Sequence, residues 1–386
     1  MIHAFPALEI TPEIKELLAL RMPVAIGVSG GKDSAVVTAE TAAHLKRVGH
    51  KGPCILIHSD LGRIEWEDSL PACERLAHRY NLELVVVRRQ AGDLIDRWLT
   101  RWRNNCDRYS QLQCVKLILP WSTASMRFCT SELKTAIICR ELVRRYPGQT
   151  ILSVSGIRRQ ESTARAIAPI CAPQVKLVNT TYSTCGYDWH PLLAWSLEDV
   201  LAYHRVYNIP LHEAYTRYGT TRVSCTFCIL SSLHDLIQSA TCLENHDIYR
   251  ELVELETVST FSFQSERWLG DIAPHLLSEE MLTRLSEARK RARQREQVEG
   301  QIPKHLLYTR GWPTIMPTFQ EAVLLSRIRR NVAEIMQIPI AYTEPESILA
   351  RYAQLMAIHT SKGGRQLNPV EIGPIQQSLW NTAIGS

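Results

Sequence analysis

Residues 24–37 read VAIGVSGGKDSAVV, and this stretch decides the fold of the chain. The run 24–28 is apolar, rich in β-branched residues and uncharged, as expected of a parallel strand buried on both faces. Gly30 and Gly31 then free the backbone for a tight turn in which successive N–H groups can point at one anion. From Ser34 the pattern predicts a helix, and the dipole at its N-terminus favours a phosphate.

The charged residues of this turn indicate a phosphate accompanied by a metal ion. Lys32 offers a mobile positive charge, whereas Asp33 is expected beside a phosphate only when a cation such as Mg²⁺ lies between them. The nucleotide loop of kinases and GTPases needs four residues between its first Gly and Gly-Lys-Ser/Thr, which this turn lacks. Residues 29–34, Ser-Gly-Gly-Lys-Asp-Ser, instead resemble the pyrophosphate loop of the ATP pyrophosphatase superfamily, which splits ATP between the α and β phosphates. The alternative is a surface turn that happens to contain two glycines.

Length and composition set the outer bounds. The 386 residues, 45% hydrophobic and 22% charged, are typical of a globular protein with more than one domain. Because the sequence changes character near residue 240, we expect an ATP-binding domain over 1–240 and a mainly helical accessory region over 241–386. The sequence contains no membrane-length apolar run and does not begin with a signal-type segment, so we expect a cytoplasmic protein without a membrane partner. The net charge of +5 suits an anionic substrate or nucleic acid without requiring either.

Strands and helices alternate through the first half of the chain. We expect helices over 11–20 and 65–80 and further strands over 54–58, 82–87 and 151–155. Short links between them predict an α/β fold with a doubly wound, mostly parallel sheet. Asp60 follows the second strand, and ligands of open parallel sheets lie at the carboxyl ends of strands, so Asp60 is expected near the glycine turn.

Residues 93–121 combine tryptophans with arginines and show no clean period. Trp98, Trp102 and Trp121 either stack on bases in a substrate-facing insertion or belong to an irregular helical excursion that covers the sheet edge.

Two later segments carry charged or nucleophilic residues at element ends. Cys129 precedes an expected helix start with Thr130 as its cap, which would lower the pKa of the thiol. Gly156 ends a strand and is followed by Arg158 and Arg165, an arrangement typical of a phosphate clamp, although a solvated basic helix is the alternative.

The cysteines are better explained by metal, cluster or catalytic use than by disulfides. There are eleven, and a reducing compartment disfavours a disulfide framework. Cys225 and Cys228 form a Cys-x-x-Cys pair, which indicates a redox pair, zinc ligation or iron–sulfur ligation, with two core cysteines as the alternative. Upstream, Ser196 and Asp199 form a capping box that opens a helix.

These segments, taken in order, resemble the phosphoadenosine phosphosulfate reductase-like family of the same superfamily, over about residues 20–235. The chain is more similar to the branch that contains the DNA phosphorothioation sulfurtransferase than to the sulfonucleotide reductases. It keeps the full ATP-type loop, whereas the Glu-Cys-Gly segment of the reductases does not occur and the last cysteine is Cys242. The resemblance implies an adenine nucleotide alpha-hydrolase-like fold.

The resemblance also implies a 4Fe-4S cluster held by Cys129, Cys225 and Cys228. Cys242 is the expected fourth ligand, with Cys139 and Cys171 as rivals. An iron left open to sulfide or substrate is a further alternative, as is tetrahedral zinc.

The implied reaction begins with ATP, whose β and γ phosphates lie in the loop with Mg²⁺ near Asp33. Arg158 and Arg165 stabilise the phosphates during attack on the α-phosphorus, and sulfur delivered through the cysteine site then displaces AMP. The expected catalytic residues are Lys32, Asp33, Arg158, Arg165 and Cys129. The expected nucleotide-binding residues are Ser29, Gly30, Gly31, Lys32, Asp33, Ser34, Asp60, Gly156, Arg158 and Glu161.

The expected partners are a DNA or RNA acceptor and a cysteine desulfurase or other sulfur donor. Two further readings remain open: a thiol-dependent sulfonucleotide reductase and a non-catalytic nucleotide-binding regulator.

The C-terminal third is predicted to be helical near 245–258, 276–300 and 318–337. The basic run 289–295, which Arg327, Arg329 and Arg330 would extend, either follows a phosphate backbone or is ordinary solvated surface.

Overall fold

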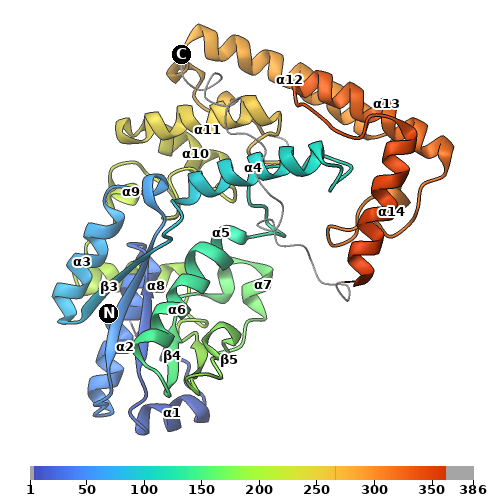
Figure 1. Cartoon of the computed structure of the whole chain (residues 1–386). Helices are drawn as coiled ribbons and strands as arrows, with labels where there is room; N and C mark the ends of the chain where they lie inside the picture. Colours follow the sequence, from blue (N-terminus) through green and yellow to red (C-terminus); the bar gives the residue numbers. More distant parts are fainter. Residues whose placement is uncertain (1–3, 266, 362–386) are drawn as a thin grey trace. The chain divides into compact units, whose positions relative to one another are not determined.

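The computed structural model describes residues 4–265 and 267–361 of the chain and contains a six-stranded sheet (Figure 1). The strand order is β3-β2-β1-β4-β6-β5, in which every neighbouring pair is parallel except β5 with β6. The predicted doubly wound, mostly parallel sheet is therefore confirmed. The strands are β1 (Val24–Val28), β2 (Cys54–Asp60), β3 (Glu83–Arg88), β4 (Thr150–Val154), β5 (Cys171–Pro173) and β6 (Cys185–Trp189).

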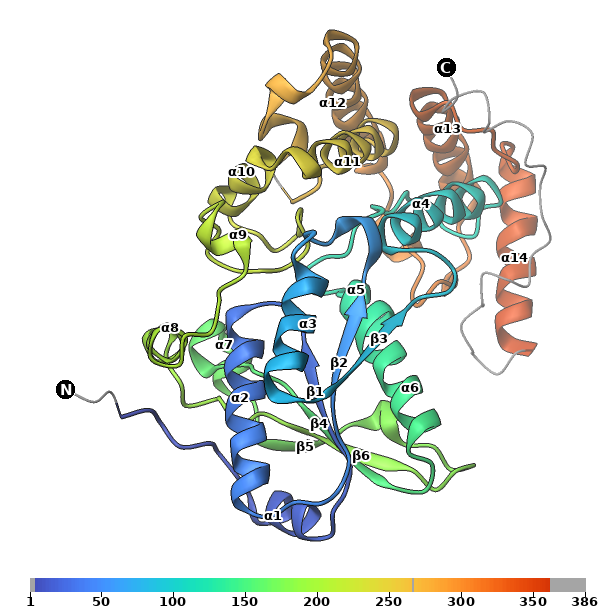
Figure 2. The same cartoon turned by 90° about the vertical axis from the view of Figure 1, so that its left-hand side faces the viewer.

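Helices cover both faces of this sheet, as Figure 2 shows for α2 and α3 on one side and α6 on the other. Side chains of β1, β2 and β4 that point to one face pack against α1, α2, α3 and α8 in one buried cluster. The alternate residues, such as Ala25 and Ile55, pack against Cys139, Leu142 and Val143 of α6. This two-sided burial explains why the strands read as nearly continuous apolar runs.

The expected helices form with small shifts at their ends. α1 begins after the Thr11 cap, whose side chain accepts from the Ile14 N–H at 3.4 Å. α3 begins at Ser69 rather than at residue 65, because a short 3₁₀ turn at Gly62–Ile64 comes first. The α-helices are α1 (Pro12–Ala19), α2 (Lys32–Arg47), α3 (Ser69–Tyr80), α4 (Leu94–Ser110), α5 (Phe128–Thr130), α6 (Ala136–Arg145), α7 (Thr163–Ala166), α8 (Leu197–Val206), α9 (Glu213–Thr216), α10 (Leu233–Thr241), α11 (His246–Ser259), α12 (Glu279–Glu299), α13 (Phe319–Met336) and α14 (Pro345–Ser361).

The chain divides into two compact units whose boundary differs from the predicted cut at residue 240. Unit 1 lies within Met1–Arg97, Trp121–Glu254 and Ser262–Ser278, and unit 2 within Trp98–Pro120, Leu255–Phe261 and Glu279–Ser386. The difference arises because residues 98–120, far upstream in sequence, pack with the C-terminal helices. Among the helices of the described residues, none is long and apolar enough to cross a membrane.

The tryptophans of residues 93–121 are interior residues. Trp98, Trp102 and Trp121 are at most 3% exposed, and the first two lie on the regular helix α4. The interpretation that these rings stack on bases is therefore wrong, and so is the expectation of an irregular excursion over most of this segment. The arginines interrupt the apolar periodicity expected of a helix, because they stand next to the buried tryptophans in the sequence.

Unit 2 contains α12, α13 and α14, with α13 in contact with both of the others. Its basic residues do not form one continuous charged face. Arg295 is 1% exposed and pairs with Glu299 at 3.0 Å, while Arg329 is fully buried and donates to the carbonyl oxygens of Tyr109, Ser110, Ala341 and Tyr342. These two arginines stabilise the unit rather than extend a basic surface.

Candidate functional site

The turn between β1 and α2 has the geometry expected of an anion-binding loop. Gly30 has a φ of +74°, and a Cβ there would lie 3.0 Å from both the His212 ring and the Ser69 carbonyl oxygen. Gly31 is the N-cap of α2. Within the described chain, the N–H groups of Gly30 and Gly31 form no hydrogen bond, so both can donate to a ligand. Ser34 braces the turn by donating to the Gly31 carbonyl oxygen at 2.7 Å.

Lys32 is buried at the first turn of α2. Its Nζ donates to the Thr221 carbonyl oxygen at 3.2 Å and lies 3.7 Å from the carboxylate of Asp33. Burial lowers the pKa of Lys32, Arg158 and Arg222 lower it further, and Asp33 opposes them. Glu161 also raises the pKa of Lys32, so the ammonium group lies in a partly desolvated surrounding of both carboxylates and guanidinium groups, where an anionic ligand would stabilise its charged form.

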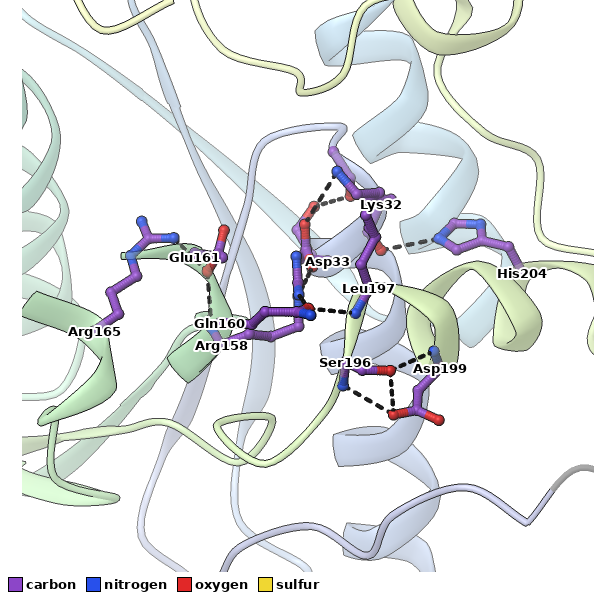
Figure 3. A network of polar contacts seen from close by, with 12 residues as sticks. Lys32, Asp33, Arg158, Gln160, Glu161, Arg165, Ser196, Leu197, Asp199 and His204 are labelled. Carbon is purple, nitrogen blue, oxygen red and sulfur yellow. Dashed lines mark hydrogen bonds and ion pairs between the residues drawn. The ribbon is translucent and has the colours of Figure 1, made fainter. Parts of the chain in front are cut away.

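Of the two arginines predicted to clamp a phosphate, Arg158 contacts Asp33 and Arg165 contacts Glu161 (Figure 3). Arg158, only 4% exposed, donates from Nε to the Asp33 carboxylate at 2.6 Å, although 125 positions separate the two residues. Glu161 accepts from the Arg158 backbone N–H at 2.8 Å and forms an ion pair with Arg165. Gly156 permits this approach, because a Cβ there would lie 2.6 Å from the Asp33 carbonyl oxygen.

The helix α8 holds this network from the other side (Figure 3). The predicted capping box forms, with Ser196 accepting from the Asp199 N–H at 3.0 Å. Gln160 accepts from both the Arg158 guanidinium at 3.1 Å and the Leu197 N–H at 2.9 Å. His204, which lies 2.9 Å from the Lys32 carbonyl oxygen, was not singled out from the sequence.

Tyr215 is a second site residue that sequence reasoning missed. Its hydroxyl accepts from the Lys32 N–H at 3.4 Å and from the Val223 N–H at 3.1 Å, and burial raises its pKa to about 12. The phenol therefore joins the phosphate loop to the segment that leads into Cys225. A contact across 183 positions leaves no local signal in the sequence.

Asp60 lines a different cavity from the one that Gly30 and Gly31 line. It accepts from the Gly62 N–H at 2.6 Å and from Arg88 Nε at 2.9 Å, and it lines a depression of about 720 Å³ at the ends of β2 and β3. Gly30 and Gly31 line a separate cavity of about 290 Å³ with residues of α3. Asp60 does lie at a strand end, but its carboxylate already has an arginine partner.

Three of the predicted cysteines share one neighbourhood. Burial raises the pKa of Cys225, the Lys134 cation opposes this rise, and Cys228 and Cys129 add to it. Cys129 lies in α5, whose N-cap is Arg127. Thr130 precedes the next helical turn, Ser131–Thr135, but its side chain accepts no capping hydrogen bond there. Three neighbouring thiols beside a cation fit three ligands of an anionic iron–sulfur cluster.

The fourth predicted ligand lies elsewhere. Cys242 packs with Trp66 and Tyr218, and its thiol donates to Glu244 at 3.0 Å. Of the rivals, Cys139 is part of the core beneath the sheet and Cys171 is on the edge strand β5. Within residues 4–265 and 267–361, no three His, Cys, Asp or Glu side chains gather as the ligands of a single metal ion.

One family of known proteins matches the sequence over more than half of its length. The sequence model of the phosphoadenosine phosphosulfate reductase domain matches residues 23–231, more than half of the chain. The crystal structure of phosphoadenylyl-sulfate reductase from Candida auris, a phosphate complex, is 14% identical, with 56% of this chain and 89% of that chain covered and a TM-score of 0.35. The U34-tRNA thiolase NcsA from Methanococcus maripaludis, with its [4Fe-4S] cluster, is 16% identical, with 70% and 75% covered and a TM-score of 0.36. No protein with curated annotation matches the sequence.

Proposed function

Because the chain belongs to the phosphoadenosine phosphosulfate reductase domain family, we propose that it activates an acceptor with ATP, releases pyrophosphate and prepares the acceptor for sulfur transfer. The observation that carries this proposal is the assembly of Lys32, Asp33 and Arg158 around a loop whose glycine N–H groups are unbonded. Such a loop suits the β and γ phosphates of ATP.

The proposed chemistry has two displacements. An acceptor oxygen attacks the α-phosphorus, a new P–O bond forms, and the bond to the β-phosphate breaks so that pyrophosphate leaves. A sulfur nucleophile from a separate donor, such as a cysteine desulfurase, then displaces AMP. Lys32 and Arg158 neutralise the charge that develops on the phosphates, and Asp33 is the candidate ligand for Mg²⁺.

Cys129, Cys225 and Cys228 are the residues that would hold a 4Fe-4S cluster, with the fourth position not provided by Cys242. When bound, such a cluster would supply a thiophilic metal site for sulfur. The thiols of Cys225 and Cys228 lie in a segment that Thr226 fastens to the Ile64 carbonyl oxygen, at 2.8 Å from its N–H and 3.1 Å from its hydroxyl. The segment is therefore held in place by its own chain.

The acceptor is proposed to be nucleic acid. The net positive charge supports this choice. The test is pyrophosphate release from ATP with single-stranded or double-stranded oligonucleotides and a sulfide donor, under anaerobic conditions.

Arg158→Ala is expected to lower the rate of pyrophosphate release by about 10²- to 10³-fold, which corresponds to the loss of one charge-stabilising donor. Arg159→Ala is the matched control, because Arg159 points to Glu9 at 2.8 Å and not to the phosphate loop. Equal rates for the two variants would contradict the assigned role.

A second candidate function follows from the family itself, whose name denotes reduction of a sulfonucleotide. Release of sulfite from a sulfonucleotide and a thiol, without ATP, would support that reductase activity and count against the first proposal.

A further inference from the structure

Unit 2 contains an open cavity of about 630 Å³, which we call the α12 cavity. All of its lining residues belong to unit 2, so it is separate from the phosphate loop of unit 1. Its basic side is formed by Arg284, Lys290 and Arg291 of α12. Its apolar side includes the half-buried Val258 and the exposed Pro339, whereas Trp102 and Met336 line it with only 3% and 7% of their surface exposed.

Two of the three cations at the cavity, Lys290 and Arg291, lack an ion-pair partner among the described residues, and the exposed Glu287 lines the same cavity. Arg291 is half-buried and donates only to the Thr257 carbonyl oxygen, at 3.3 Å. Burial lowers its pKa, while Glu287 raises it without forming an ion pair. In the described part of the chain, neither Lys290 nor Arg291 forms an ion pair. A partly desolvated guanidinium is costly without an anion, so an anionic ligand would offset this cost.

The cavity is distinct from the general charge of its helix. Arg295, one turn further along α12, is buried with Glu299 and faces the interior. Arg293 is exposed and does not line the cavity. Of the cations in the basic run 289–295, Lys290 and Arg291 line the cavity and the others do not.

The combination of groups fits a nucleotide better than an acidic peptide. A volume of about 630 Å³ is within the range of small-ligand pockets. Cations match a phosphate, and the apolar side offers a surface for the flat face of a base. Gln294, which also lines the cavity, carries both a donor and an acceptor for the edge of a base.

We propose that the α12 cavity seats one nucleotide of a single-stranded nucleic acid, with its phosphate on Lys290 and Arg291 and its base against the apolar side. This inference rests on the proposed function only for the idea that the acceptor is nucleic acid. It adds the part of the chain that holds the strand.

The test is fluorescence anisotropy of a labelled single-stranded oligonucleotide with the full chain, in the absence of ATP and at several salt concentrations. Replacing Lys290 and Arg291 together by Ala removes two phosphate contacts. The slope of log K against log salt should therefore become shallower by about 1.4, and affinity at 0.1 M salt should fall by about tenfold or more. Arg293→Ala should leave the slope unchanged and the affinity within about twofold.

Three results would overturn the proposal. One is an equal loss in Arg293→Ala, which would mean diffuse charge. Another is equal affinity for an oligonucleotide without bases, which would mean that no base is seated. The third is displacement of the oligonucleotide by polyglutamate at equal charge concentration, which would indicate a site for acidic protein.

The design also separates this proposal from the proposed function. If the double variant unfolds, Lys290→Ala alone keeps the test valid. The Lys290 side chain is exposed and forms no hydrogen bond or ion pair with the described residues. Binding without pyrophosphate release would refute the catalytic proposal alone. Pyrophosphate release with unchanged binding in Lys290→Ala and in the double variant would refute the cavity alone.

Discussion

At the scale of single residues, Gly30 combines two constraints in one position. Its φ of +74° disfavours any side chain. A Cβ would also lie only 3.0 Å from both the His212 ring and the Ser69 carbonyl oxygen, so these neighbours would have to shift. Gly49 has a similar φ of +67° but has nothing within 4 Å of an added Cβ. The two glycines therefore separate the cost of backbone conformation from the cost of crowding.

Gly49→Ala should lower the free energy of unfolding by about 1–2 kcal/mol through backbone strain alone. Gly30→Ala should add about 1–3 kcal/mol of overpacking to a similar strain. Urea denaturation of both variants measures the difference. Equal destabilisation would mean that the loop moves away from His212 at no cost.

His58 makes stability depend on pH. Its ring lies 3.1 Å from both the Val28 carbonyl oxygen and the Glu65 carboxylate, and 3.8 Å from the Cys73 sulfur. Burial lowers the pKa of His58, but Cys73 and Glu65 outweigh it and raise the pKa to about 10, from an ordinary value of 6.5. The stabilisation is therefore complete below pH 6.5 and is lost as pH rises towards 10.

Unfolding of the wild type between pH 6.5 and 10 should show this loss, with a limiting slope of about 1.4 kcal/mol per pH unit. Glu65→Gln should flatten the slope, because the variant removes a charge that holds the proton. Glu67→Gln, at an exposed neighbouring position, should retain the wild-type slope. An unchanged slope in Glu65→Gln would contradict the role of the pair.

At the scale of elements, the segment between α9 and α10 is fastened to the phosphate loop through the Tyr215 hydroxyl as well as through the bond from Lys32 Nζ to the Thr221 carbonyl oxygen. Tyr215→Phe leaves the N–H groups of Lys32 and Val223 without this acceptor. We expect a destabilisation of about 1–3 kcal/mol and faster alkylation of Cys225, since the segment loses one of its attachments. Denaturation and mass-spectrometric mapping of thiol modification measure the two effects.

Tyr207→Phe is the control for this substitution. Tyr207 is 47% exposed, and among the described residues its hydroxyl forms no hydrogen bond. It should change neither stability nor the alkylation rate. If Tyr215→Phe behaves in the same way, the two segments are held together by other contacts.

The elements themselves were largely predictable, whereas their long-range partners were not. The strand, turn and helix around Ser29–Ser34 follow from local patterns of apolar residues and glycine. The capping box at Ser196 is equally local. By contrast, the contact of Arg158 with Asp33 was expected only as a shared site, and the roles of Tyr215 and His204 depend on packing across the sheet, which no short-range pattern encodes.

At the scale of the whole molecule, the division into two units could not be read from the order of the sequence. Residues 98–120 and 255–261 belong to unit 2, although they lie upstream of its main segment, residues 279–386. Tertiary packing decides this, through buried groups such as Arg295, which contacts the ring of Phe261 and pairs with Glu299. From the sequence alone, an arginine such as Arg295 is interpreted as part of a basic surface. Only its burial in the structure identifies it as a core residue.

The buried pair predicts a sharp contrast between neighbouring glutamates. Glu299→Ala removes the buried carboxylate at 3.0 Å from Arg295, leaves only the exposed Glu296 carboxylate at 3.5 Å, and should cost about 3–5 kcal/mol in the free energy of unfolding. Glu296→Ala, whose side chain is 66% exposed, should cost less than about 1 kcal/mol. Guanidinium titration compares the two variants. Similar values would mean that Arg295 finds another partner or reaches water.

The central claim is that the loop of residues 29–34 binds ATP. Isothermal calorimetry of the anaerobically purified full chain with ATP and Mg²⁺ tests it most directly. The account predicts saturable binding that Lys32→Ala abolishes and that Lys46→Ala, at an exposed position of the same helix, preserves. Absence of heat with ATP, together with binding of a sulfonucleotide, would contradict it.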